Sequence, residues 1–186
     1  MSIALVDQLN FEKNLPIDGN CKQQIAIAQP CTGVGAYPLG SYFLINIPRC
    51  SNDTVFDPMN SFLRFNASNA DGTGVLNWAH SVNSVISKLE VLHAGNVLET
   101  VDNYGQLSAL LLDSQVDQSS RVNGLNLTMG TGTSLTAPGQ GATLAAAGSN
   151  WYSITLLSGI VGSLARYYIP VNELQGSLQI RITLAH

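Results

Sequence analysis

The stretch "VISKLEVLHAGNVLETV", residues 85–101, decides the fold class of this chain. Its first half alternates, with Leu89 and Val91 on one face and Lys88 on the other. Alternation at period two is typical of a half-buried strand. "HAGN" supplies the residues of a tight turn, and "NVLETV" returns as a second strand. The stretch therefore predicts an antiparallel β-hairpin.

Further segments alternate in the same way and are separated by clusters of Gly, Pro, Asn and Ser. Seven or eight short strands with turns between them indicate an all-β, antiparallel sandwich or barrel. The predicted strands are Tyr42–Pro48, Ser61–Ala67, Val85–Leu92, Asn96–Val101, Tyr152–Leu157 and Leu178–Leu184. The apolar face of each strand supplies the predicted core, which is Phe43, Ile45, Leu63, Phe65, Leu89, Val91, Ile154, Ile180 and Ile182.

The segments outside the strands predict short helices and long connections. Leu107, Leu110 and Leu111 recur at helical spacing after Tyr104, which predicts a short helix there. A second short helix is expected around 158–168. Residues 117–150 are rich in Gly, Ser, Thr and Ala and are expected to form a long loop.

The start of the chain differs from the rest in pattern. Residues 1–38 lack strong strand or helix signals and are expected to form an N-terminal arm, followed by a single domain over 39–186. The first residues carry no basic segment before an apolar run, so a secretory signal is not expected.

The composition indicates a surface covered by neighbouring subunits. The 186 residues are 45% hydrophobic and only 11% charged, against about 25% in a typical soluble domain. No apolar run reaches the roughly 18 residues that a spanning helix needs. The net charge is −4, and the eight Lys and Arg residues are scattered, so direct nucleic-acid binding is not expected.

The residues that usually carry chemistry form no recognisable site. His80, His93 and His186 lack metal-ligand spacing, and the three cysteines form no CxxC pair. Eight further candidates are interpreted as loop, turn, surface or packing residues and not as ligands: Gly33, Gly35, Asp53, Asp57, Glu90, Glu99, Trp78 and Trp151. Glu90 and Glu99 are expected to face solvent or a neighbour. We therefore predict no catalytic, cofactor-binding or metal-binding residue, and no enzyme activity.

Two blocks of the sequence form a recognisable pattern when taken together. The first block has an expected strand, a glycine turn, a return strand and a short Tyr-Gly helix; its pattern residues are Ile86, Leu89, Glu90, Val91, Gly95, Asn96, Leu98, Glu99, Tyr104 and Gly105. The second runs from a strand through an apolar segment and "IPVNEL" to a final strand; its pattern residues are Ile154, Leu156, Leu157, Ile169, Pro170, Val171, Leu174 and Ile180. Together these blocks resemble the vertical jelly-roll major capsid proteins of DNA viruses, and "YFLINIPR" is similar to an early strand of that family. The chain departs from the family in having "AG" for "GG" and one roll where most members have two.

The resemblance implies a two-sheet antiparallel jelly roll with short helices in its loops. It implies a viral capsid subunit that assembles into an icosahedral shell as a trimer or pentamer, together with other capsid proteins. An internal membrane would be compatible with such a shell, and the protein would reside in the virion. The alternative is a carbohydrate-binding or adhesin-type β-sandwich, for which Trp78, Trp151, Tyr167 and Tyr168 would supply binding aromatics.

Overall fold

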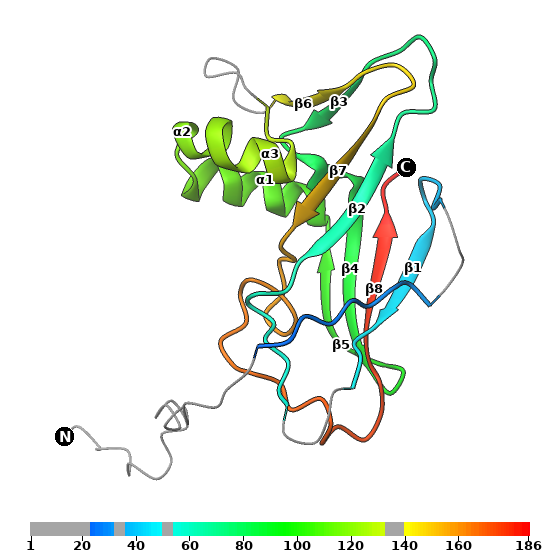
Figure 1. The fold of residues 1–186 in the computed structure, drawn as a ribbon, viewed down its shortest axis with the longest axis vertical. Helices are drawn as coiled ribbons and strands as arrows, with labels where there is room; N and C mark the ends of the chain where they lie inside the picture. Colours follow the sequence, from blue (N-terminus) through cyan, green and yellow to red (C-terminus); the bar gives the residue numbers. More distant parts are fainter. Residues whose placement is uncertain (1–22, 32–35, 50–53, 133–139) are drawn as a thin grey trace, which may run out of the picture.

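The computed structural model describes residues 23–31, 36–49, 54–132 and 140–186. Within these residues the chain forms antiparallel strands and a few short helices (Figure 1). The strands are β1 (Tyr42–Asn46), β2 (Leu63–Ser68), β3 (Leu76–Ala79), β4 (Ile86–His93), β5 (Asn96–Asp102), β6 (Gln140–Leu144), β7 (Ser149–Ile154) and β8 (Leu178–Leu184). All six strands predicted from the sequence are present, each within three residues of its expected ends. β3 and β6 were not predicted.

The strands pair in a nested order. β1 pairs with β8, β2 with β7, β3 with β6 and β4 with β5, all antiparallel. A further pairing of β4 with β8 closes a four-stranded sheet in the order β1-β8-β4-β5. The ribbon β2–β7 lies in front of this sheet in Figure 1.

The core lies between the four-stranded sheet and the β2–β7 ribbon. Leu89, Val91 and Ile182 from the sheet and Ile154 from β7 have no solvent exposure. Phe43, Ile45 and Ile180 are also buried, as predicted. Leu63 and Phe65 are only partly buried, although they pack against the same cluster. They remain half-exposed because the described second layer here is only two strands wide.

The helical elements follow β5. They are α1 (Tyr104–Gln115), α2 (Gln118–Ser120), η3 (Arg121–Leu125) and α3 (Asn126–Met129), with a short helical turn η2 (Val82–Val85) between β3 and β4. The helix predicted after Tyr104 is therefore confirmed. The prediction of one loop over 117–150 was wrong, because 118–129 is helical and β6 and the start of β7 occupy its end. Asp117 starts the helical stretch, since its carboxylate accepts a hydrogen bond from the backbone N–H of Ser120 (3.0 Å).

The prediction of a helix around 158–168 was also wrong, because these residues form successive turns. The Ser158 hydroxyl accepts hydrogen bonds from the backbone N–H groups of Ile160 (3.1 Å) and Val161 (3.0 Å), which fixes the first turn. A Cβ at Gly162 would collide with the carbonyl oxygen of Leu156. The chain can thus turn back on itself only with glycine there.

The described part of the predicted arm has two parts with different surroundings. Residues 23–29 are extended and exposed, with Ile25 and Ile27 86% and 84% exposed. Cys31 donates its backbone N–H to the carbonyl of Leu44 (2.7 Å), and Tyr37 packs its ring 4.9 Å from that of Phe43. Residues 31 and 37 therefore belong to the edge of the sandwich beside β1.

Candidate functional site

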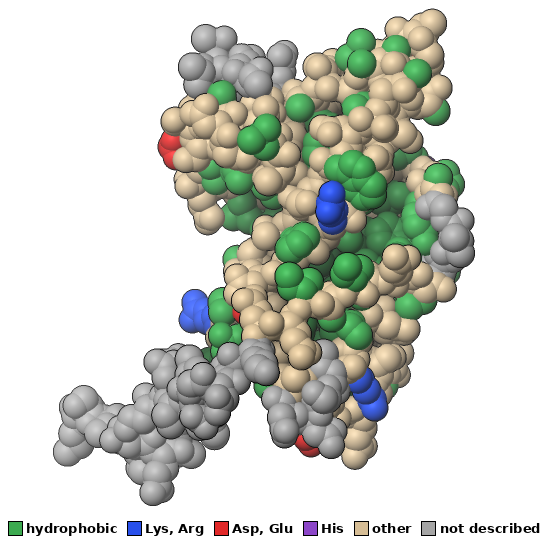
Figure 2. Space-filling model, viewed as in Figure 1, with side chains coloured by type: hydrophobic (Ala, Val, Ile, Leu, Met, Phe, Trp, Pro, Cys, Tyr) green, Lys and Arg blue, Asp and Glu red, His purple; other side chains and the backbone are tan. Residues whose placement is uncertain are grey.

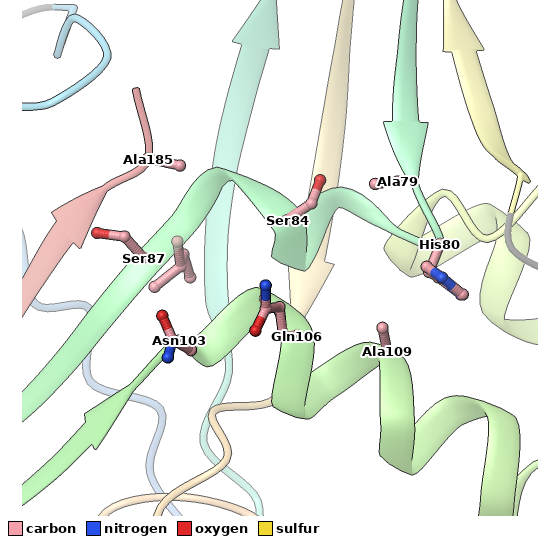
Figure 3. Close-up of a pocket in the computed structure, with 10 residues that line it drawn as sticks. Ala79, His80, Ser84, Ser87, Asn103, Gln106, Ala109 and Ala185 are labelled. Atoms are coloured by element: carbon pink, nitrogen blue, oxygen red, sulfur yellow. The ribbon is translucent and has the colours of Figure 1, made fainter.

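A pocket of about 350 Å³ opens between α1, η2 and the first residues of β4 (Figure 3). Gly105 in the first turn of α1 allows this arrangement, because a Cβ there would lie 3.0 Å from the Cα of Ser84. The close approach of α1 and η2 forms the floor of the pocket. The amide of Asn83 donates to the hydroxyl of Ser108 (2.6 Å) and so ties η2 to α1 beneath it.

The pocket is lined by neutral polar side chains and small apolar ones. Its polar lining residues are His80, Ser84, Ser87, Asn103 and Gln106, and its apolar ones are Ala79, Ile86, Ala109 and Ala185, with Gly105. Figure 3 shows the side chains of Ser87, Asn103 and Gln106 near one another, with Ser84 and His80 further along. Among the described residues, neither Lys, Arg, Asp nor Glu lines it.

His80 stands at one end of this pocket and is only partly exposed. Its Nδ1 lies 3.5 Å from a carboxylate oxygen of Asp113, in a geometry that makes no hydrogen bond. The other oxygen of Asp113 accepts a hydrogen bond from the buried guanidinium of Arg121 (2.6 Å). The Asp113 carboxylate therefore joins α1 to the helical stretch that follows, and His80 packs beside this pair.

The other two histidines lie away from the pocket's polar groups. His93 ends β4 and is half-buried, with its Nε2 lacking a hydrogen-bond partner among the described residues. His186 is exposed, and its ring lies beside Gly40. Across the ranges that the structure describes, no three His, Cys, Asp or Glu side chains are placed to hold a metal ion.

The two glutamates, which were expected to face solvent or a neighbour, differ in exposure, and Glu99 is partly exposed. Glu90 is only 6% exposed, on the outer face of the four-stranded sheet, and so does not face solvent. It accepts a hydrogen bond from Arg181 (2.5 Å) and lies 3.3 Å from the ammonium of Lys88. The hydrogen bond from Arg181 holds the pKa of Glu90 below its ordinary value, against the opposing effect of burial. The carboxylate can stay charged while buried because the side chains of Lys88 and Arg181 cover it.

Glu99 binds the segment that follows β7. One of its oxygens accepts a hydrogen bond from the Ser158 hydroxyl (2.5 Å) and the other from the backbone N–H of Gly159 (2.8 Å). Glu99 thereby anchors the turns after β7 to the edge strand β5. The two carboxylates hold separate parts of the fold and do not form a catalytic pair.

The aromatic candidates also separate. Trp78 is buried and donates its indole N–H to the hydroxyl of Tyr152 (2.9 Å). Trp151 is 56% exposed, with the guanidinium of Arg64 5.1 Å above its ring. Tyr167 and Tyr168 are exposed on the turns after β7. These four residues do not form one row, as a sugar-stacking surface would require.

The remaining four sequence candidates are two aspartates and two glycines. Asp57 accepts hydrogen bonds from the backbone N–H of Met59 (3.2 Å) and the amide of Asn60 (2.6 Å), which is the turn role expected for it. Asp53, Gly33 and Gly35 lie outside the described residues.

Sequence reasoning missed the pocket residues Ser84, Asn103 and Gln106. The signal for them is weak, because "VNSV" and "DNYGQ" are ordinary turn and helix-start sequences. Their proximity depends on how α1 packs on η2, and nothing in the spacing of the residues encodes that packing.

Large apolar side chains are exposed over much of the described surface. Figure 2 shows hydrophobic side chains over the β2–β7 face, with charged side chains only as isolated spots. The most exposed ones are Ile25, Ile27, Leu39, Phe62, Val75, Leu110, Leu127 and Tyr167. None of the described helices is long and apolar enough to cross a membrane.

No known protein-family model matches this chain, and no curated protein matches it significantly.

Proposed function

We propose that this chain is a structural subunit of a viral shell, built as a single jelly roll and without catalytic activity. In this proposal the subunits form trimers or pentamers that assemble, with other capsid proteins, into an icosahedral capsid. The chain makes no direct contact with nucleic acid, and the shell leaves room for an internal membrane. The protein then resides in the virion.

The strand pairing supports the jelly-roll part of the proposal. A jelly roll is an eight-stranded, two-sheet sandwich made of Greek keys, as if one long hairpin had been rolled up. The nested pairs β1–β8, β2–β7, β3–β6 and β4–β5 are compatible with such a rolled hairpin, and in this chain they lie in one four-stranded and two two-stranded sheets. Because one fold serves many functions, this topology supports the architecture and leaves the function to the surface.

The observation that carries the functional proposal is the exposure of apolar side chains on two irregular segments. In residues 23–29 the two isoleucines, Ile25 and Ile27, project almost fully into solvent. In the turns after β7, Leu164, Tyr167 and Tyr168 are 58%, 61% and 59% exposed. Where exposed apolar side chains gather into a patch, they mark an interaction surface in soluble proteins. Both segments are suited to packing against neighbouring subunits.

The first test is assembly of the whole chain. We expect sedimentation velocity to show closed oligomers that grow with concentration, and electron microscopy to show particles. Each subunit should bury roughly 800 Å² or more against its neighbours, as stable interfaces do. A chain that stays monomeric at high concentration, with no particles in the micrographs, would overturn the proposal.

The second test separates the contact segments from the rest of the surface. Leu164→Ser should weaken assembly without lowering the melting temperature, since its side chain is exposed in the subunit. Leu127→Ser on α3, where the side chain is 77% exposed, is the matched control and should assemble normally. Removal of residues 1–29 should likewise weaken assembly and leave the sandwich folded. Equal effects of both serine variants would contradict the assignment of the contact surface.

A further inference from the structure

The pocket between α1 and η2 contains polar groups that the fold itself does not use. The side chains of Ser84, Asn103 and Gln106 make no hydrogen bond to any other described residue, although all three line this pocket. By contrast, Ser87 donates to the backbone carbonyl of Thr183 (3.1 Å) and keeps only acceptor capacity. Two carboxamides and a hydroxyl are thus available to a ligand, with both donors and acceptors.

The backbone brings two of the polar lining residues to the pocket through an uncommon conformation. His80 and Asn103 have φ values of 62° and 52°, in the left-handed region. The other described non-glycine residues with positive φ are Ala94 and Ala147, which lie in turns between strands. Left-handed conformations cost energy in residues with a Cβ, and they cluster at functional sites. Here they place side chains from two separate elements along one pocket (Figure 3).

The chemistry of the lining, as far as the described residues form it, favours a neutral ligand. The described lining residues carry no fixed charge, and His80 is the one titratable side chain among them. Ala79, Ala109 and Ala185 provide a small apolar surface next to the polar groups. A sugar ring matches both features, because each hydroxyl donates and accepts a hydrogen bond while the C–H groups pack on apolar surface. The volume of about 350 Å³ is near the lower end of ligand pockets, which span about 300–1,000 Å³.

We propose that this pocket binds a single neutral pyranose unit through Ser84, Asn103 and Gln106. A free monosaccharide and the terminal unit of a glycan both present such a pyranose ring. The site is separate from the proposed shell contacts, and it does not depend on whether the chain assembles.

Saturation-transfer NMR on the full chain tests this proposal with glucose, galactose, mannose and N-acetylglucosamine, each as the free sugar and as its methyl glycoside. At least one should bind with a dissociation constant of about a millimolar, as expected for a small ligand in an open pocket. Binding of the methyl glycoside as well as the free sugar identifies a glycan terminus. Binding of the free sugar alone identifies a monosaccharide.

Two substitutions on α1 localise the binding. Gln106→Ala removes one carboxamide from an exposed helix position, and we expect affinity to fall at least tenfold. Ala109→Leu places a larger side chain in the pocket and should abolish binding. Gln115→Ala, the same change at the far end of α1, is the matched control and should bind as the unmodified chain does. Melting curves of all three variants establish that they are folded.

The proposal is overturned if the dissociation constants of all the sugars lie well above the millimolar range. It is also overturned if binding survives both Gln106→Ala and Ala109→Leu. Binding of inorganic phosphate at this pocket with no sugar binding would also overturn it, because the ligand would then be an anion.

Discussion

Leu89→Ala should destabilise the sandwich more than most single changes in this chain. Leu89 lies on β4, a central strand with partners on both sides, where it is opposite Val101 on β5 and Ile182 on β8. It has no exposed surface. Removing its isobutyl group loses the transfer free energy of the buried methyl groups and leaves a cavity, which together cost about 2–5 kcal/mol. Because the flanking strands prevent β4 from moving inward, we expect the upper half of this range.

Leu98→Ala provides the matched control within the same hairpin. Leu98 lies on the edge strand β5 and is 55% exposed, so its truncation should cost no more than about 1 kcal/mol. Urea unfolding followed by tryptophan fluorescence measures both free energies of unfolding, and equal m-values show that the comparison is valid. If Leu89→Ala costs less than about 1 kcal/mol, or no more than Leu98→Ala, the assigned core face of β4 is wrong.

Two further predictions concern buried polar groups. Burial raises the pKa of Tyr104 to about 12, and its hydroxyl accepts the backbone N–H of Leu157 (2.9 Å). Tyr104→Phe should therefore cost about 1–3 kcal/mol in urea unfolding, because that N–H is left without a partner, whereas Tyr168→Phe on the surface should cost almost nothing. The hydrogen bond from Arg181 lowers the pKa of Glu90 from 4.5, so the unfolded chain takes up this proton first as the pH falls. The stability that this group contributes is complete above about pH 4.5 and is lost as the pH falls below it. Glu90→Gln should therefore flatten the acid limb of a pH–stability curve. An unchanged acid limb would count against the pairing of Glu90 with Arg181.

The strands could be predicted because their signal is local. In β8 the apolar residues alternate strictly, in β4 Leu89 and Val91 alternate with Lys88 and Glu90, and the hairpin between β4 and β5 joins neighbours in the sequence. The pairing of the remaining strands could not be predicted in this way. β1 meets β8 across most of the chain, with Tyr42 opposite Thr183, and period-two alternation carries no information about partners.

β3 and β6 were missed because their sequences are poor in β-branched residues and rich in Gly, Ala and Asn. β3 and β6 form because the pairing of β2 with β7 continues beyond the ends of those two strands. The backbone N–H of Asn69 donates to the carbonyl of Gly148, and that of Ala147 donates to the carbonyl of Asp71. Tertiary context here overrides weak local propensity.

Glu90 shows the limit of alternation as a guide to exposure. The pattern places Glu90 on the face opposite Leu89, where its side chain was expected to meet solvent or a neighbour. Arg181 and Lys88 cover the carboxylate instead, and their identity as partners follows from the β4–β8 register, where Glu90 is opposite Arg181. Only a known register could have predicted the pair.

The attachment of α1 to the sandwich makes the two proposals separable. The hydroxyl of Tyr104 accepts the Leu157 N–H, and the amide of Asn83 binds Ser108, so α1 is tied both to the segment after β7 and to η2. The walls of the pocket are thus held in place by the fold, and the pocket keeps its shape without a ligand. Figure 1 places α1 in the upper half of the molecule and the turns after β7 in the lower half. Leu164→Ser should therefore weaken assembly and leave sugar binding intact, whereas Gln106→Ala should do the reverse. If each change altered both properties, the pocket would be part of the subunit contact, and the two proposals would reduce to one.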